Sequence, residues 1–197
     1  DQRFLLYVGN IKRHKNLVIL LKAFSQIDKN LKLYIVGNYE ELDSPDYQVI
    51  SSIKDNNRII LKGKVNNKLL REYYSNAELF IFPSLYEGFG LPPLEAMACG
   101  LTVLGSDIIP IREIIDHAKN GWICRTDPES IRTAVKDLLD NSNLCSSLGR
   151  KANKSAKENF ALNKIIDKEI TVIKSVIKNY YNLHSEYKTS TSVNKID

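Results

Sequence analysis

The chain has 197 residues, 43% of them hydrophobic and 26% charged, and a formal net charge of +5. This length is enough for one ordinary domain, and the composition excludes collagen-like, low-complexity and mostly disordered proteins. All of the excess positive charge lies in residues 150–197, where ten Lys and Arg accompany five acids, whereas residues 1–149 balance at 18 against 18. The body of the chain therefore lacks the one-sided basic surface of a nucleic-acid reader, and no nucleic-acid partner is expected.

Short apolar runs alternate with longer segments of helical periodicity. The apolar runs predict strands at residues 4–8, 31–36, 58–61, 78–82, 102–105 and 122–124. The segments between them predict helices at 16–27, 47–54, 67–76, 92–98 and 128–139. Strand–helix alternation at this spacing, with strands that show little polar alternation, indicates an α/β fold: a Rossmann-like parallel sheet with helices on both faces.

From Asn141 onward the pattern is helical only. Apolar residues at steps of three or four give one long helix an apolar stripe for docking, namely Leu162, Ile166, Ile170, Ile173, Ile177 and Tyr181. We expect residues 1–184 to form one domain that includes these helices, and residues 185–197 to form a disordered tail. The lysines of this end are expected to be solvated, and the alternative is a peripheral contact with the anionic inner membrane surface.

The cysteines and the first residues bear on the compartment. Cys99, Cys124 and Cys145 are odd in number and form no C-x-x-C pair, which argues against both a disulfide framework and a zinc site. No apolar run approaches the roughly 20 residues that span a bilayer. The chain starts at Asp1 with neither Met nor a signal peptide, which predicts a piece of a longer protein. A cytoplasmic protein is expected.

The loop after the first predicted strand reads G-N-I-K-R-H-K-N from Gly9 to Asn16. In open parallel sheets, ligands bind beyond the carboxyl ends of the strands, where helix N-termini favour anions. Arg13 and Lys15 suit a diphosphate there, because Lys supplies a mobile point charge and Arg a planar fork of donors. The alternative is a solvated loop with Asn16 as a helix cap. The loop has no G-K-[ST] and no G-x-G-x-x-G, the motifs typical of ordinary P-loop enzymes and of nicotinamide-dependent enzymes, so the sequence does not indicate either class.

The loop after the fourth predicted strand continues into a helix as Y-E-G-F-G-L-P-P-L-E-A-M-A-C-G, from Tyr86 to Gly100. The glycines around Phe89 let the backbone approach a ligand closely, and two prolines preset the first turn of the helix. Glu87 on the loop and Glu95 in or near that turn can face one crevice, as hydroxyl-rich ligands require. The alternatives are a solvated acid for Glu87 and stabilisation of the helix dipole for Glu95.

This run closely resembles the signature of the large family 4 of retaining glycosyltransferases, in which two glutamates enclose seven residues. The likeness covers roughly residues 4–181 and includes Y-V-G-N-I-x-x-x-K-N from Tyr7 and L-x-x-x-Y-x-x-A-x-L-F-I-F-P-S from Leu70. It implies the C-terminal, nucleotide-sugar-binding half of a GT-B enzyme, with an acceptor-binding half before Asp1. The implied reaction is retaining transfer of a hexosyl group from a nucleotide diphosphate sugar to a glycan or lipid-linked acceptor, in polysaccharide biosynthesis. The isolated chain is expected to be inactive.

The resemblance also implies roles residue by residue. Glu95 matches the carboxylate that accepts hydrogen bonds from the ribose hydroxyls. Glu87, close to the transferred sugar, and Lys15, on the donor diphosphate, match the catalytic pair. Further donor contacts are implied for Gly9, Asn10, Arg13, Lys64, Val65, Gly88, Phe89, Gly90 and Leu91. Where the family usually carries an arginine, this chain has Asn10 and His14, and we expect Arg13 to supply the guanidinium.

No metal and no other cofactor is expected. The sequence has no D-x-D motif and no His/Cys/Asp cluster, and fixed cations can do what a divalent ion does elsewhere. Alternatives remain for the function as a whole. The chain can be a nucleotide-sugar-binding module or subunit without activity of its own, or a sugar-nucleotide epimerase of the same architecture. A glycosidase also uses two acids, but the cationic loop and the Gly-rich turn have no purpose there.

Overall fold

The computed structural model describes residues 2–28, 30–38 and 56–191. The chain divides into two compact units, Asp1–Lys157 and Glu158–Asp197. The helix expected at residues 47–54 lies outside the described residues. None of the helices among residues 2–28, 30–38 and 56–191 combines the length and the apolar character of a membrane span.

Six parallel strands form one sheet in the first unit. They are β1 (Phe4–Val8), β2 (Lys32–Val36), β3 (Ile59–Gly63), β4 (Leu79–Phe82), β5 (Val103–Ser106) and β6 (Trp122–Cys124), in the spatial order β3-β2-β1-β4-β5-β6. Each strand lies within two residues of its predicted bounds, because a strand buried on both faces is a short apolar run. The predicted α/β class, a Rossmann-like parallel sheet, is confirmed.

Helices follow the strands. The first unit contains a short 3-10 helix (Arg13–Lys15), α1 (Leu17–Phe24), α3 (Asn67–Asn76), α4 (Leu91–Ala98), α5 (Ile109–Arg112), α6 (Pro128–Asp140) and most of α7 (Ser142–Asn159). The helix predicted at 16–27 is shorter at its C-terminal end, because the amides of Gln26 and Ile27 bond three residues back rather than four. The four residues of α5 are too few for a helical periodicity to show in the sequence.

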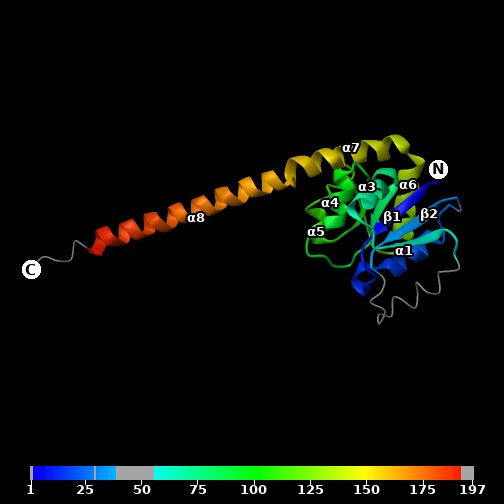
Figure 1. Cartoon of the computed structure of the whole chain (residues 1–197), viewed down its shortest axis with the longest axis horizontal. Helices are drawn as coiled ribbons and strands as arrows, with labels where there is room; N and C mark the ends of the chain where they lie inside the picture. Colours follow the sequence, from blue (N-terminus) through cyan, green and yellow to red (C-terminus); the bar gives the residue numbers. More distant parts are fainter. Residues whose placement is uncertain (1, 29, 39–55, 192–197) are drawn as a thin grey trace, which may run out of the picture. The chain divides into compact units, whose positions relative to one another are not determined.

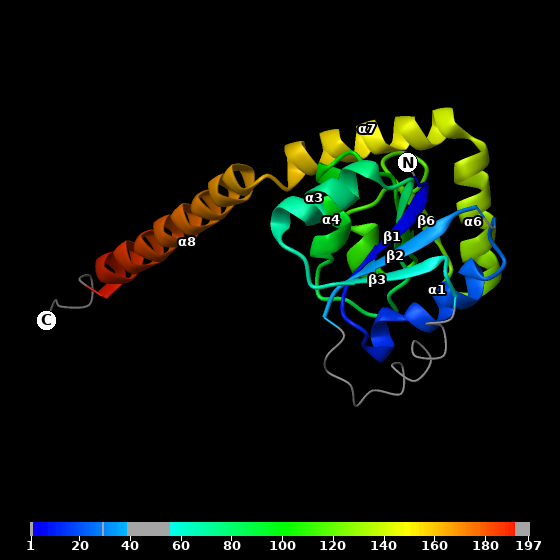
Figure 2. The same ribbon diagram turned by 45° about the vertical axis from the view of Figure 1, so that its right-hand side comes forward.

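The helices cover both faces of the sheet. In Figure 2, α1 and α6 lie on one side of the strands, and α3 and α4 lie on the other. Successive strand residues point to opposite faces, and Leu5, Leu6 and Tyr7 of β1 are all fully buried. Leu5 and Tyr7 belong to the cluster that includes Leu20 of α1 and Val135 of α6. The core is therefore the pair of layers on either side of the central strands.

Capping residues fix where several helices begin. Asp127 accepts a hydrogen bond from the Ser130 amide at 2.9 Å, and Pro128 occupies the first position of α6. The Asn66 side chain caps α3 in the same way, accepting from the Leu69 amide at 2.9 Å. At the far end of α4, Gly100 has a left-handed φ of 79° and its amide bonds to the Met97 carbonyl. These local signals agree with the predicted helix positions.

The second unit contains α8 (Leu162–Thr191), the long helix of Figure 1. The predicted apolar stripe runs along it, and its six residues, Leu162, Ile166, Ile170, Ile173, Ile177 and Tyr181, are each at least 42% exposed. Docking of this stripe stays a prediction. The domain assignment of residues 1–184 with a disordered tail at 185–197 also stays a prediction, and α8 itself extends to Thr191.

Candidate functional site

The sheet order predicts a ligand-binding crevice at the carboxyl ends of β1 and β4, between the loops that follow these strands. These two strands are neighbours, but the chain continues from β1 to β2 on one side and from β4 to β5 on the other. Ligands bind at such a topological switch point. The two loops touch directly: the Leu85 amide donates to the His14 carbonyl at 2.7 Å, and the Asn16 side-chain amide donates to the Pro83 carbonyl at 3.2 Å. The loops after β1 and β4 are therefore in direct contact.

Asn16 shows how this junction is held. It has a left-handed φ of 55° and is 8% exposed. It stands at the N-cap position of α1, but its side chain makes no capping bond and crosses to Pro83 instead. The alternative in which the Asn16 side chain caps the helix is therefore wrong, because this side chain joins the loop after β1 to the loop after β4.

Lys15 and Glu87 form an ion pair between the loop after β1 and the loop after β4. The Lys15 ammonium donates to both carboxylate oxygens of Glu87, at 2.6 and 2.8 Å. The side chains are only 15% and 10% exposed, and the ammonium also lies 5.5 Å from the centre of the Phe82 ring. Partial removal of water strengthens this attraction relative to a surface pair. The interpretation of Glu87 as a solvated loop acid is therefore wrong.

Glu95 has a different partner. The hydroxyl of Tyr74, on α3, donates to Glu95 Oε2 at 3.0 Å, and Tyr74 is 2% exposed. Burial, together with the nearby Glu95 charge, raises the pKa of Tyr74, so its hydroxyl stays protonated and remains a donor. The Glu95 residue itself is exposed. Because α4 begins at Leu91, Glu95 lies beyond the first turn, where the helix dipole has little effect.

Close backbone packing joins the carboxyl ends of β1, β2 and β3. The Gly9 amide donates to the Val36 carbonyl at 2.9 Å, and the Gly37 amide donates to the Gly63 carbonyl at 3.0 Å. An ideal Cβ on Gly37 would lie 1.9 Å from the Gly9 carbonyl oxygen. Only glycine fits at residue 37 without moving the loop that leads to Lys15.

The remaining predicted residues surround this edge. Arg13 is exposed in the 3-10 helix, and Lys64 is exposed directly after β3, with Val65 half-buried. Gly88, Phe89 and Leu91 are exposed, whereas Gly90 is buried at the N-cap of α4 with a left-handed φ of 104°. Among the described residues, no hydrogen bond or ion pair links Arg13 or Lys64 to either glutamate. These residues lie near the carboxyl ends of the strands, but they do not form one hydrogen-bonded cluster.

Buried polar groups also lie near the carboxyl ends of the strands; Asn10 was expected from the sequence as a donor contact, whereas Ser84 and Ser106 were not. The hydroxyls of Ser84 and Ser106 and the side-chain oxygen of Asn10 are buried without a partner among residues 2–28, 30–38 and 56–191. Ser84 follows β4, and Ser106 ends β5, so both stand at carboxyl ends of strands. Tyr74 lies inside the motif that starts at Leu70, which marks the position but not its contact with Glu95. Within these same ranges, no three His, Cys, Asp or Glu side chains gather to hold a metal ion.

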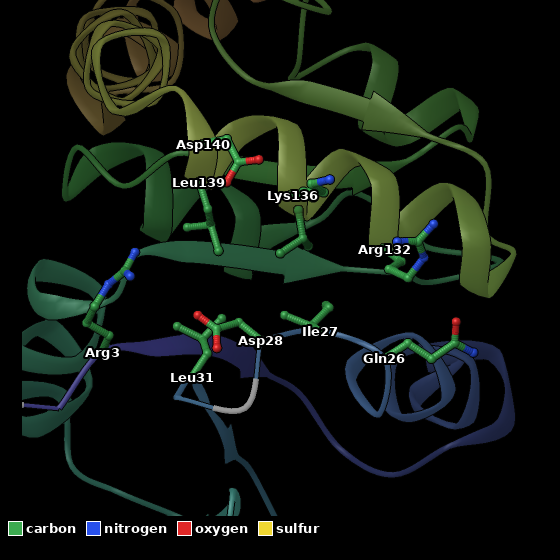
Figure 3. Close-up of a pocket in the computed structure, with 10 residues that line it drawn as sticks. Arg3, Gln26, Ile27, Asp28, Leu31, Arg132, Lys136, Leu139 and Asp140 are labelled. Atoms are coloured by element: carbon green, nitrogen blue, oxygen red, sulfur yellow. The ribbon is translucent and has the colours of Figure 1, made fainter.

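A separate hollow of about 270 Å³ lies near the amino ends of β1 and β2, between the end of α1 and α6 (Figure 3). Its lining mixes an apolar base with charges of both signs and comprises Arg3, Gln26, Ile27, Asp28, Leu31, Arg132, Val135, Lys136, Leu139 and Asp140. None of the predicted site residues lines it. The hollow is therefore distinct from the crevice between the loops after β1 and β4.

Comparison with known protein families identifies the chain. The family described as glycosyl transferases group 1 matches residues 1–155. The chain belongs to the group 1 glycosyl transferases. It is 28% identical over 185 residues to N-acetyl-alpha-D-glucosaminyl L-malate synthase of Bacillus anthracis, a match that covers 90% of this chain and 47% of that protein. This group 1 glycosyltransferase chain spans about half the length of the curated relatives that it matches.

Solved structures share the fold of this glycosyltransferase domain. Sucrose-phosphate synthase from Thermosynechococcus elongatus superimposes with a TM-score of 0.83 at 24% identity, over 91% of this chain and 46% of that one. Anabaena HepE in complex with UDP-glucose superimposes with a TM-score of 0.80 at 19% identity, over 89% of this chain and 49% of that one. The glycosyltransferase domain thus has the fold of one half of a GT-B enzyme.

Proposed function

We propose that this chain is the donor domain of a retaining hexosyltransferase of family 4, which uses a nucleotide diphosphate sugar. The observation that carries the proposal is the Lys15–Glu87 pair, held in the crevice between the loops after β1 and β4. A cation and an acid at a topological switch point suit a ligand that combines a diphosphate with a hydroxyl-rich sugar. The UDP-glucose bound by the HepE relative is a ligand of this kind.

Lys15 is proposed to hold the donor diphosphate. When the glycosidic bond breaks, the nucleoside diphosphate leaves with the bonding electron pair, and a fixed cation stabilises the charge that develops on its phosphate. The structure shows the Lys15 ammonium donating to both oxygens of Glu87. Binding of the diphosphate therefore gives Lys15 a second anionic partner. This weakens its ion pair with Glu87 and allows the Glu87 carboxylate to hydrogen-bond to the sugar.

The two glutamates are proposed to meet different parts of the donor. Glu87 and Glu95 are taken as the acids of the E-x7-E motif, with Glu87 at the sugar and Glu95 at the ribose. The exposed loop residues Gly88, Phe89 and Leu91 and the buried Gly90 are taken to offer backbone amides to the sugar and phosphate. This order follows the chain from the loop into α4.

The rest of the donor is proposed to extend across the carboxyl ends of β1, β2 and β3. Gly9 and Asn10 flank the diphosphate, and the exposed Arg13 supplies the guanidinium that the family usually carries nearby. The buried, unpartnered side-chain oxygen of Asn10 suits a polar ligand at this position. Lys64 and Val65, which follow Gly63 at the end of β3, are taken to meet the nucleotide base. The fixed cations Lys15 and Arg13 make the proposed reaction independent of metal ions.

The remaining partners are proposals as well. An acceptor half, supplied by another part of the protein or by another chain, would hold the glycan or lipid-linked acceptor, and the apolar stripe of α8 offers it a surface. The alternative role of this helix is a peripheral contact between its lysines and an anionic membrane surface. A catalytic role needs both halves, because donor and acceptor must be held in one reactive geometry.

Slow transfer of the hexose to water tests the proposal without knowledge of the acceptor. This chain joined to an acceptor half is incubated with GDP-mannose, UDP-glucose and dTDP-rhamnose, and NMR identifies the anomer released before mutarotation. We expect one donor to release its hexose with the donor's own anomeric configuration. The chain alone should bind that donor but release almost no hexose. Inversion, or full activity of the chain alone, would contradict the proposal.

A further inference from the structure

Tyr74 makes a buried contact with an acid of the proposed donor site. Its hydroxyl donates to Glu95 Oε2 at 3.0 Å, and the residue is 2% exposed. Its ring packs edge-on against Phe80 with the centroids 5.6 Å apart. The ring position is thus fixed by the core between α3 and β4, and the hydroxyl is aimed at the carboxylate from a rigid support.

Only one of the two carboxylate oxygens of Glu95 takes part in this contact. Tyr74 bonds to Oε2, and no other hydrogen bond or ion pair to the Glu95 side chain is present in the described part of the chain. The Glu95 residue is exposed, so Oε1 remains available to an external donor. A long, exposed carboxylate otherwise has several rotamers, and ordering it costs conformational entropy when a ligand binds.

We infer that Tyr74 is a positioning residue that holds the Glu95 carboxylate ready to accept the hydroxyls of a nucleotide ribose. This inference rests on the proposed contact between Glu95 and the ribose. The Tyr74 hydroxyl fixes Oε2 of Glu95 and directs Oε1 toward the ligand. The Glu95 side chain therefore loses less conformational entropy when the ligand binds. A neutral donor suits this role, since it orients the carboxylate without cancelling the charge that strengthens its hydrogen bonds to hydroxyls.

The test measures how strongly the chain prefers a ribose to a sugar without hydroxyls. Calorimetry gives the affinities of UDP, GDP and ADP and of their 2′,3′-dideoxy counterparts for the full chain. We expect the wild-type chain to bind one ribonucleotide about 10- to 100-fold more tightly than its dideoxy form, as is typical of a hydrogen bond to a charged group. Glu95→Gln should remove most of this preference.

Tyr74→Phe keeps the ring and removes only the hydroxyl. We expect it to reduce the ribose preference by about three- to tenfold, less than Glu95→Gln does because the carboxylate itself remains, and to leave the affinity for the dideoxy form unchanged. Tyr73→Phe is the matched control on the same helix, since Tyr73 packs against Phe4 and Tyr34 and does not contact Glu95. A loss of general packing would instead weaken both nucleotide forms equally.

The outcomes separate the inference from the function on which it rests. If the wild type prefers the ribonucleotide, Glu95→Gln loses the preference and Tyr74→Phe retains it in full, Tyr74 is not a positioning residue, although the proposed donor site stands. If the wild type binds ribose and dideoxy forms alike, or binds neither, the Glu95–ribose contact is wrong and the inference is overturned with it.

Discussion

Replacement of Lys15 by alanine is expected to weaken the binding of a nucleoside diphosphate by about 10- to 100-fold, and to leave the binding of the corresponding nucleoside unchanged. The reason is that the ammonium makes a charge-assisted contact that only the diphosphate can use. Lys22→Ala, which removes an equally charged but exposed side chain near the other end of α1, is the control and should change neither affinity. Calorimetry with matched nucleoside and diphosphate pairs gives the comparison.

The structure adds a reciprocal expectation for Glu87. Its carboxylate shares the Lys15 ammonium at 2.6 and 2.8 Å, so it competes with an incoming phosphate for the same cation. Glu87→Gln should therefore bind the free nucleoside diphosphate at least as tightly as the wild type does. Equal weakening of nucleoside and diphosphate by Lys15→Ala, with the fold intact, would contradict the placement of the diphosphate.

Loss of Lys15 also leaves the Glu87 carboxylate without its partner in a site where it is 10% exposed. An uncompensated, partly buried charge destabilises a fold, so Lys15→Ala alone can lower the unfolding midpoint. The double variant Lys15→Ala/Glu87→Gln removes the stranded charge. It should recover the stability but not the affinity for the diphosphate, which separates a binding defect from an unfolding defect.

Gly37→Ala is expected to lower the free energy of unfolding by about 1–3 kcal/mol, the usual cost of an overpacked site. The added Cβ would lie 1.9 Å from the Gly9 carbonyl oxygen, and neither backbone can yield without disturbing the ends of β1 and β2. Urea unfolding measures the change. The loop that carries Lys15 starts at Gly9, so the affinity for a nucleoside diphosphate should fall as well.

Gly88→Ala is the matched control for Gly37→Ala. Apart from Gly88 itself and its two chain neighbours, no atom of the described residues lies within 4 Å of an ideal Cβ on Gly88, although this glycine also belongs to the predicted donor site. Its free energy of unfolding should stay within about 0.5 kcal/mol of the wild-type value. An unchanged unfolding curve for Gly37→Ala would mean that the contact between residues 9 and 37 does not hold the strand ends together.

Much of the fold could be predicted from the sequence. The strands are short apolar runs because both faces of a parallel sheet are buried, and α3 begins and ends at its predicted residues. The α5 helix was missed because four residues carry no periodic signal. The early end of α1 depends on three-residue backbone bonds after Phe24, and no residue type there marks the change.

The site was predictable only in part. Sheet topology alone brings the loops after β1 and β4 together, which is why Lys15 and Glu87 could be expected near one crevice. Their direct pairing across 72 positions of the chain, and the contact between Tyr74 and Glu95, depend on side-chain packing that no local pattern encodes. Asn16 shows the same limit, since its residue type suggests a cap while its side chain joins two loops.

The central claim is that the crevice between the loops after β1 and β4 binds the diphosphate of a nucleotide through fixed protein cations. The most direct measurement is calorimetric titration of the chain with UDP, GDP, ADP and dTDP, each with and without excess EDTA. The account predicts saturable binding of at least one of them, with the same affinity in both conditions. Binding of none of the four, or binding that disappears when the chelator is added, would contradict it.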